Sequence, residues 1–200
     1  MKNVIIFLGY NSNNLFGANN DIRYIKNTIN INNYKHIESI TLEYENATLK
    51  NIIKSINTFS KIDNLIIYFS GNGTNNGKIE IYNDKIYHKD IFKNINVKIN
   101  KLIYILDCCY SENFIHENVN NNINKIILLS SCSKNQTSKE VLMKNNDTYK
   151  VRGIFTYYLC KIINYKKLYD FNSWDKIKDN NIWDVIDKKF NQTFLYKIFF

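Results

Sequence analysis

Three short polar segments contain the residue types best suited to chemistry, and each follows a run of apolar residues. They are Ser70-Gly71-Asn72-Gly73, Asp107-Cys108-Cys109-Tyr110-Ser111 and Ser130-Ser131-Cys132. A cysteine just after a buried strand is a candidate nucleophile, but it needs a general base, most often a histidine, on a neighbouring strand end. The alternative is that Cys108 and Cys109 are small apolar residues packed at a strand end. The residue types alone leave both interpretations open.

Two further patterns near these segments miss the spacing that their chemistry requires. Gly73-x-x-x-Gly77-Lys78 is one residue short of a phosphate-binding P-loop, and Ile79 stands where that loop needs a Ser or Thr for Mg²⁺. Gly71, Gly73 and Gly77 miss the dinucleotide-binding spacing by one residue. No cluster of His, Cys and Asp has the spacing of zinc ligands. The sequence therefore predicts neither a nucleotide nor a zinc cofactor.

Apolar runs that alternate with segments of helical period predict the elements that must position these residues. Strands are predicted at Val4–Leu8, Ile37–Leu42, Leu65–Phe69, Leu102–Leu106, Ile126–Leu129 and Phe194–Ile198, with a hairpin of Lys78–Tyr82 and Lys85–Tyr87 around Asn83-Asp84. Helices are predicted after the capping residues Asp21 and Thr48, near Asp90–Ile95, from Gly153 onward and over about Ile182–Phe190. The polar stretch from Ser133 to Arg152 is predicted to be a long loop. This alternation favours one α/β domain over residues 1–200, with a mostly parallel sheet and helices on both faces. The three polar segments would then meet at the carboxyl edge of the sheet.

The composition is strongly skewed and limits what the charge implies. The chain has 35 Asn, 33 Ile and 25 Lys but only 2 Arg, 2 Ala and no Pro, which is the pattern of an AT-rich genome. The net charge of +9 comes almost wholly from lysines scattered along the chain. A nucleic-acid partner would favour a basic stripe that includes arginine. We therefore expect no nucleic-acid partner.

The lengths of the apolar runs and the positions of the cysteines indicate where in the cell the protein is located. No run approaches the ~20 apolar residues that cross a bilayer, and the N-terminus lacks the layout of a signal peptide. The adjacent Cys108 and Cys109 do not resemble a secreted disulfide framework. We expect no membrane partner and a reducing, cytoplasmic location.

The polar segments also resemble the motifs of the metacaspase and caspase family of cysteine peptidases, peptidase family C14. Tyr68–Thr74 is similar to the histidine motif Y-x-S-G-H-G-T, and Ile105–Ser111 is similar to the nucleophile motif I-L-D-[SC]-C-H-S-G. Three more segments resemble family motifs: Leu15–Asp21, Ser130–Glu140 and Gly153–Leu159. The five matches occur in order along nearly the whole chain. The resemblance implies a caspase-like α/β sandwich with a six-stranded sheet, and a family whose roles are proteolysis and programmed cell death.

Carried over residue by residue, the resemblance retains most of the family's site. It implies that Cys109 is the nucleophile, that Gly73 lies at the oxyanion hole, and that Asp21 and Asp107 line the pocket that selects Lys or Arg. It places Asn72 at the general base. An amide does not titrate near neutral pH, and loss of the base should cost ~10²–10⁴ in rate. We expect a pseudo-protease or regulatory caspase-like domain that binds a basic peptide segment or another caspase-like protein.

Two alternatives to this expectation remain open. The chain could be an active cysteine endopeptidase in which Cys109 uses a different base, either His88 or His116, or it could be a non-catalytic scaffold. His36 precedes a predicted strand and is not expected to reach the site.

Two expectations depend on comparison with the family's other features. The acidic stretches with which many metacaspases bind Ca²⁺ are hard to find in this chain, so neither calcium nor another cofactor is expected. The stretch from Ser133 to Arg152 corresponds to the place where the family often carries its activation cleavage. An active, basic-specific enzyme would cut itself there, after Lys134, Lys139, Lys144, Lys150 or Arg152.

Overall fold

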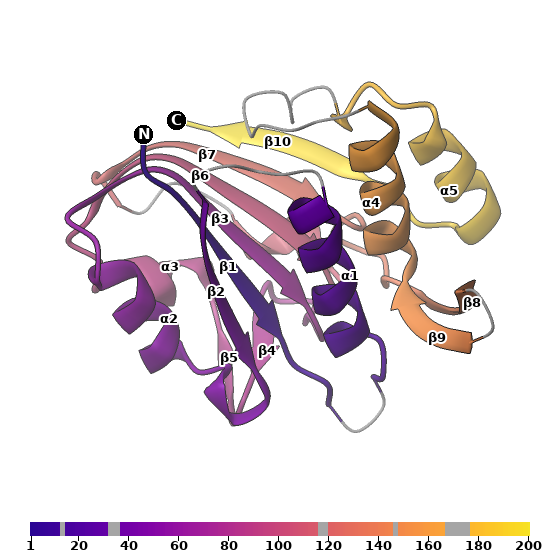
Figure 1. Ribbon diagram of the computed structural model, residues 1–200, viewed down its shortest axis with the longest axis horizontal. Coiled ribbons are helices and arrows are strands. Elements are labelled where there is room, and N and C mark those ends of the chain that lie inside the picture. The colour runs from indigo at the N-terminus through magenta and orange to yellow at the C-terminus, as the bar shows by residue number, and fades with distance from the viewer. Residues whose placement is uncertain (13–14, 32–36, 116–119, 146–147, 167–176) are drawn as a thin grey trace.

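A twisted six-stranded sheet forms the centre of the molecule, with strand order β10-β7-β6-β3-β1-β2 (Figure 1). The computed structural model describes residues 1–12, 15–31, 37–115, 120–145, 148–166 and 177–200. The strands of this sheet are β1 (Asn3–Gly9), β2 (Ile37–Glu43), β3 (Lys61–Ser70), β6 (Lys98–Asp107), β7 (Ile123–Ser130) and β10 (Leu195–Phe199). Neighbouring strands are parallel except for β10, which is antiparallel to β7. The predicted mostly parallel six-stranded sheet is confirmed.

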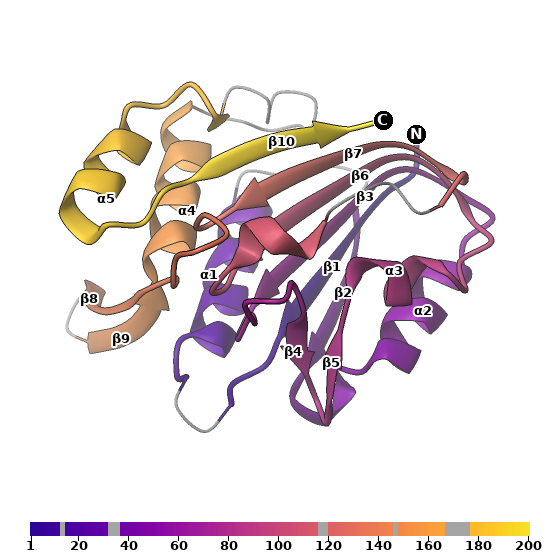
Figure 2. The ribbon, with the colours of Figure 1, turned by 180° about the vertical axis from the view of Figure 1, so that it is seen from behind.

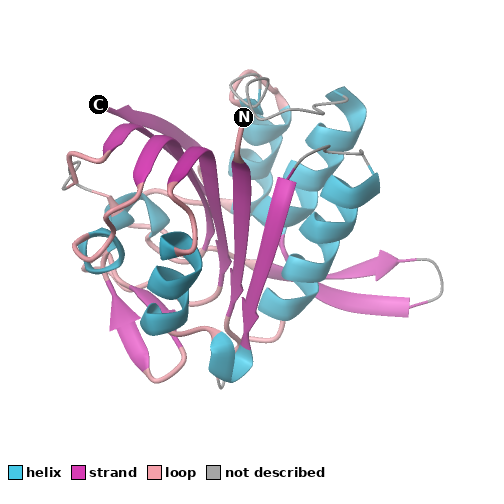
Figure 3. Ribbon diagram, turned by 60° about the vertical axis from the view of Figure 1, so that its left-hand side comes forward, coloured by secondary structure: helices cyan, strands magenta, loops and turns pink. Residues whose placement is uncertain are grey.

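Helices cover both faces of the sheet, as predicted (Figures 2 and 3). One face packs against α1 (Ala18–Ile31), α4 (Ile154–Lys166) and α5 (Ile182–Phe190), and the other against α2 (Leu49–Asn57) and α3 (His88–Phe92). Successive side chains of a strand point to opposite faces. In β3, Ile66 and Tyr68 therefore pack toward α1 and α4, whereas Ile67 and Phe69 pack toward α2 and α3. Burial on both faces explains why these strands read as unbroken apolar runs. Within the described ranges, no helix is long and apolar enough to cross a membrane.

Some helices begin where the sequence predicts, and others do not. Thr48 caps α2, since its Oγ1 accepts a hydrogen bond from the Asn51 N–H at 3.2 Å. The prediction that Asp21 caps a helix is wrong, because α1 begins at Ala18 and Asp21 lies in its first turn. The Asp21 side chain is instead turned into the protein, where other donors satisfy it. Helix α3 begins at His88, ahead of the predicted Asp90.

Two hairpins leave the sheet. The first, β4 (Ile79–Ile81) with β5 (Asp84–Ile86), was predicted, but its turn residues are Tyr82 and Asn83, the latter with a positive φ of 58°. The second is formed by β8 (Glu140–Asn145) and β9 (Thr148–Gly153), and Figure 3 shows it projecting from the helices. The prediction of a long loop from Ser133 to Arg152 is therefore wrong. Two short 3₁₀ turns, η1 (Tyr44–Asn46) and η2 (Ser111–Phe114), complete the described elements.

Candidate active site

The strand register brings the polar segments together at the carboxyl edge of the sheet. Ser70 at the end of β3 pairs with Asp107 at the end of β6, and Ser70 also pairs with Gly9 at the end of β1. Ser130 closes the neighbouring strand β7. Segments that lie up to 60 residues apart in the sequence, from Ser70 to Ser130, thus lie at the ends of three successive strands of the sheet, β3, β6 and β7.

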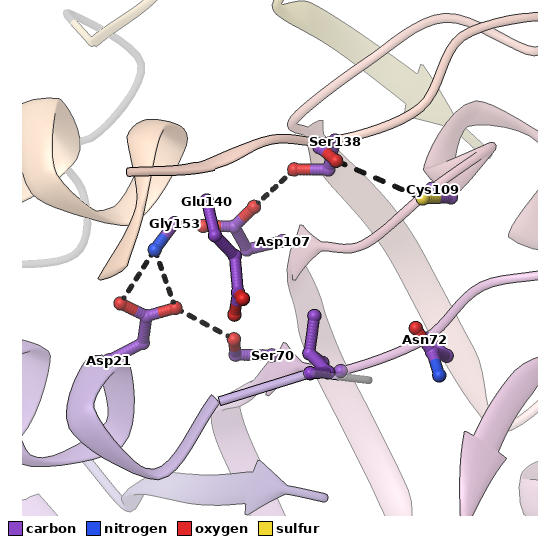
Figure 4. A pocket seen from close by; sticks show the side chains of 10 residues that line it. Asp21, Ser70, Asn72, Asp107, Cys109, Ser138, Glu140 and Gly153 are labelled. Carbon is purple, nitrogen blue, oxygen red and sulfur yellow. Dashed lines mark hydrogen bonds between the residues drawn. The ribbon is translucent and has the colours of Figure 1, made fainter. Parts of the chain in front are cut away.

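Cys109, Asn72, Asp21 and Asp107 all line one small pocket at this edge (Figure 4). The rest of its described lining is Leu15, Ser70, Gly71, Ser138, Glu140 and Gly153. In Figure 4 the carboxylates gather on one side of the pocket, and Cys109 and Asn72 lie on the other. The cavity volume is about 20 Å³, the room that a single water needs. The protein's own side chains therefore nearly fill the pocket.

Asp21 is held by donors from two other elements. Its carboxylate accepts hydrogen bonds from the Ser70 hydroxyl at 2.9 Å and from the Gly153 N–H at 3.1 Å. Burial raises the pKa of Asp21 well above its usual value, and the charge of Asp107 raises it further. The two acids are therefore close enough to repel each other.

Asp107 is held by three donors. Its carboxylate accepts from the Ser138 hydroxyl at 2.6 Å, from the Thr156 hydroxyl at 2.7 Å and from the Thr156 N–H at 3.0 Å. The Tyr68 hydroxyl in turn lies 2.5 Å from the Thr156 hydroxyl. Burial raises the pKa of Asp107, although these hydrogen bonds act in the opposite direction. Ser138 thereby fixes the carboxylate from the segment that leads into β8.

A third carboxylate, Glu140, completes the acidic side of the pocket. It accepts a hydrogen bond from the Gly17 N–H at 2.7 Å, and burial raises its pKa. Two glycines make room for the acids: a Cβ on Gly153 would lie 2.1 Å from an Asp107 oxygen, and one on Gly17 would lie 2.3 Å from a Glu140 oxygen. No lysine, arginine or histidine appears among the described residues that line the pocket. Three acids thus face one space that offers no counter-charge.

Cys109 follows β6 at a sharp turn of the chain. Its half-buried thiol donates to the Ser138 carbonyl at 3.9 Å, and burial raises its pKa, so the neutral thiol dominates at pH 7. The next residue, Tyr110, has a left-handed backbone with φ of 54°. Gly73 packs against this turn, because a Cβ there would lie 2.0 Å from the Cys109 carbonyl oxygen. The Gly73 backbone is therefore in close contact with the Cys109 turn.

The Asn72 amide is engaged by neighbours other than Cys109. Its NH₂ group donates to the hydroxyl of Ser12 and to Glu80 Oε2, the latter at 3.0 Å. These contacts fix the amide at the rim of the pocket. Asn72 contributes no group there that can accept a proton near neutral pH.

The alternative bases do not reach this pocket within the described part of the chain. His88 lies on the opposite face of β6 to the core of α1 and α4, in a cluster with Phe92, Tyr104 and Phe114. Its Nδ1 is 3.0 Å from the Tyr104 hydroxyl, its Nε2 has no described partner, and burial lowers its pKa to about 4. The hypothesis that His88 replaces the base is therefore wrong. His36 and His116 lie outside the described residues.

Sequence reasoning assigned no role to several residues that build the pocket. Ser138 and Glu140 fall within the segment that resembles a family motif, but the segment appeared to be a loop. Gly153 and Thr156 open the predicted helix and gave no sign that they hold the acids. A partial signal was present after Asp147, where Tyr149 and Val151 alternate with Lys150 and Arg152 in the period of a strand. Among the described residues, no group of three or more His, Cys, Asp or Glu side chains is arranged to hold a metal ion.

The sheet is mostly parallel and lies between two helical layers. Cys109 follows β6, and Asn72 follows the neighbouring strand β3. This arrangement defines the caspase-like α/β class. The family model for the peptidase C14 caspase domain matches residues 3–176. The chain belongs to the caspase-domain family.

A solved structure supports this fold. Protein GSU0716 from Geobacter sulfurreducens superposes with a TM-score of 0.66 at 14% sequence identity, covering 100% of this chain and 94% of its own. Caspase-1 from Spodoptera frugiperda has a TM-score of 0.48 at 12% identity, covering 82% of this chain and 69% of its own. A search of curated proteins gives no match to this sequence.

Proposed function

We propose that this caspase domain is a pseudo-protease that holds a basic side chain at its acidic pocket without cleaving the peptide. The observation that carries the proposal is the Asn72 amide, which faces the pocket of Cys109 where the metacaspase motif has its histidine. General acid–base catalysis contributes ~10²–10⁴ in rate, and an amide supplies none of it. Cleavage should therefore be lost even though the nucleophile position keeps its cysteine.

The charge around Cys109 supports the same proposal. A catalytic cysteine reacts as its thiolate, which a neighbouring imidazolium or other cation stabilises. Here burial raises the pKa of the Cys109 thiol, and the charge of Asp107 raises it further. No described residue of the pocket carries a positive charge that would offset this effect. The thiol should be a poor nucleophile at neutral pH.

The acidic side of the pocket supports a basic ligand. Asp21, Asp107 and Glu140 converge there, and burial raises the pKa of each. A guanidinium or ammonium group would relieve their mutual repulsion, and a guanidinium can also bind a carboxylate through two parallel hydrogen bonds. This is the Lys or Arg preference that the metacaspase resemblance implies.

The small volume of the pocket sets a condition on binding. A cavity of about 20 Å³ does not admit an arginine side chain while Ser138 bonds to Asp107. The segment that carries Ser138 and Glu140 must shift when a ligand enters, and the ligand's own N–H groups would then replace the Ser138 hydroxyl. Binding should be weaker than to an open pocket, because this rearrangement costs free energy.

The test compares two fluorescent peptides that differ only in charge, one ending in arginine and the other in its neutral analogue citrulline. Fluorescence polarisation should show tighter binding of the arginine peptide. The substitution Glu140→Gln, which keeps an oxygen to accept from Gly17, should reduce that preference. The matched control Glu45→Gln removes an exposed acid elsewhere and should leave the preference unchanged. Equal affinity for both peptides would contradict an acidic ligand pocket.

A further inference from the structure

Both arginines of the chain lie at a second pocket, which shares no described lining residue with the pocket of Cys109. The sequence has 25 lysines and only two arginines, Arg23 and Arg152. Arg23 is on α1 and Arg152 is on β9, and they line one cavity of about 240 Å³ together with Lys150. The lining residues come from α1, α4 and β9, three elements that pack together (Figure 1). The presence of both arginines at one cavity distinguishes this pocket from the other described pockets.

Arg152 is built into the pocket as a fixed, buried cation. Its residue is 6% exposed, and its guanidinium carbon lies 3.8 Å from the centre of the Tyr24 ring. Stacking on an aromatic face holds the planar group in one orientation. Its Nε has no hydrogen-bond partner within the described part of the chain. Buried polar groups nearly always have a partner, so this donor needs an acceptor from outside the described residues, either a water molecule or a ligand.

The electrostatics of the pocket are one-sided. Arg23, Lys150 and Arg152 contribute three positive charges, and the other described lining residues are uncharged: Asn20, Tyr24, Asn27, Thr28 and Asn164. None of the three cations takes part in an ion pair described in the structure. Like charges around one cavity repel each other until an anion lies between them. The exposed Asn27 amide can add a neutral hydrogen bond to such an anion.

We propose that this pocket is a binding site for a small anion that carries a phosphate group. Arginine's planar fork matches phosphate oxygens in bidentate geometry, and the phosphate dianion balances three cations better than a single carboxylate does. The cavity is smaller than the ~300–1,000 Å³ usual for drug-sized ligands, which favours a small phosphate compound. Arg152 provides the oriented contact from the wall, and Arg23 and Lys150 close on the anion from the exposed rim.

Calorimetric titration with inorganic phosphate at pH 7.5 tests the proposal, with sodium chloride holding the ionic strength constant. We expect saturable one-to-one binding to the full chain, and at least tenfold weaker binding of acetate. The variant Arg23→Gln/Lys150→Gln removes two exposed cations of the pocket and should weaken phosphate binding at least tenfold. The control Lys50→Gln/Lys54→Gln removes the same charge from α2, on the other face of the sheet, and should change it less than twofold.

Arg152→Lys gives a second, independent readout. It keeps the charge but removes the planar fork, so it should weaken phosphate binding at least fivefold, with folding checked by the thermal melt. Absence of saturation in the native protein up to 10 mM phosphate would overturn the proposal. So would equal binding of acetate, or equal weakening by the two double variants, which would indicate a general charge effect.

Discussion

His88 allows a quantitative test of the core beneath the sheet. Its side chain is 3% exposed and lies among Phe92, Tyr104 and Phe114, and burial lowers its pKa from 6.5 to about 4. The folded protein therefore binds a proton at this site less readily than the unfolded chain does. The stability that neutral His88 contributes is fully present above pH 6.5 and is lost as the pH falls from there through about 4.

The size of this effect follows from the two pKa values. The difference corresponds to a total of about 3 kcal/mol between high and low pH. At pH 5 most of the histidine in unfolded chains is protonated and little of it in the folded protein, so about 2 kcal/mol should already be lost. Small domains have a free energy of unfolding of about 5–15 kcal/mol, so the loss is readily measured.

Urea unfolding followed by tryptophan fluorescence at pH 7.5 and pH 5.0 measures it, with His88→Gln as the matched variant. The native protein must be compared with the variant, because Asp21 and Asp107 have raised pKa values in both proteins. Protonation of these two acids changes the free energy of unfolding in the direction opposite to that of His88. Between the two pH values, the native protein should lose about 2 kcal/mol more than the variant. Equal losses would refute a neutral, buried His88.

Three further predictions concern the pocket and the hairpin. Thr156→Val keeps the shape but removes the buried hydroxyl between Tyr68 and Asp107, so urea unfolding should show a loss of about 1–3 kcal/mol. The control Thr41→Val removes a partly buried hydroxyl that accepts from Lys26, and it should cost less than half as much. Gly153→Ala should lower the melting temperature, because its Cβ would lie 2.1 Å from an Asp107 oxygen; an unchanged melting temperature would contradict this close packing. If Asn72→His restores activity, mass spectrometry should find that variant cut after an exposed lysine but not after the buried Arg152. The exposed lysines of this segment are Lys134, Lys139, Lys144 and Lys150. The control Asn72→His/Cys109→Ala should stay intact.

The elements that bury the most apolar surface could be predicted from the sequence. The central strands read as unbroken apolar runs because helices cover both of their faces, and Leu65–Phe69 and Leu102–Leu106 fall inside β3 and β6. The helix cap at Thr48 could also be predicted, because its hydroxyl accepts a hydrogen bond from an amide only three residues away. Signals of these two kinds depend on neighbours in the sequence or on burial alone.

The contacts that shape the pocket depend on residues distant in the sequence and could not be predicted in this way. Asp21 looks like a helix cap, yet its partners are Ser70 and Gly153, 49 and 132 residues away. His88 looked accessible because it follows a hairpin, whereas the register of β6 places Tyr104 beside it in the core. The family resemblance named Cys109, Asn72 and the acids, which line one pocket, but it could not show that the Ser138 hydroxyl bonds to Asp107 there.

The central claim is that Asn72 alone removes turnover from a site that is otherwise assembled. The direct measurement is hydrolysis of an arginine-ending fluorogenic peptide by the native protein, Cys109→Ala, Asn72→His and Asn72→His/Cys109→Ala. In Asn72→His, Glu80 is placed to accept one imidazole N–H and so to orient the ring, because it already accepts from the Asn72 amide. We predict a background rate for the native protein, a rise of ~10²-fold or more in Asn72→His, and loss of that rise in the double variant. Hydrolysis by the native protein that Cys109→Ala abolishes would contradict the claim.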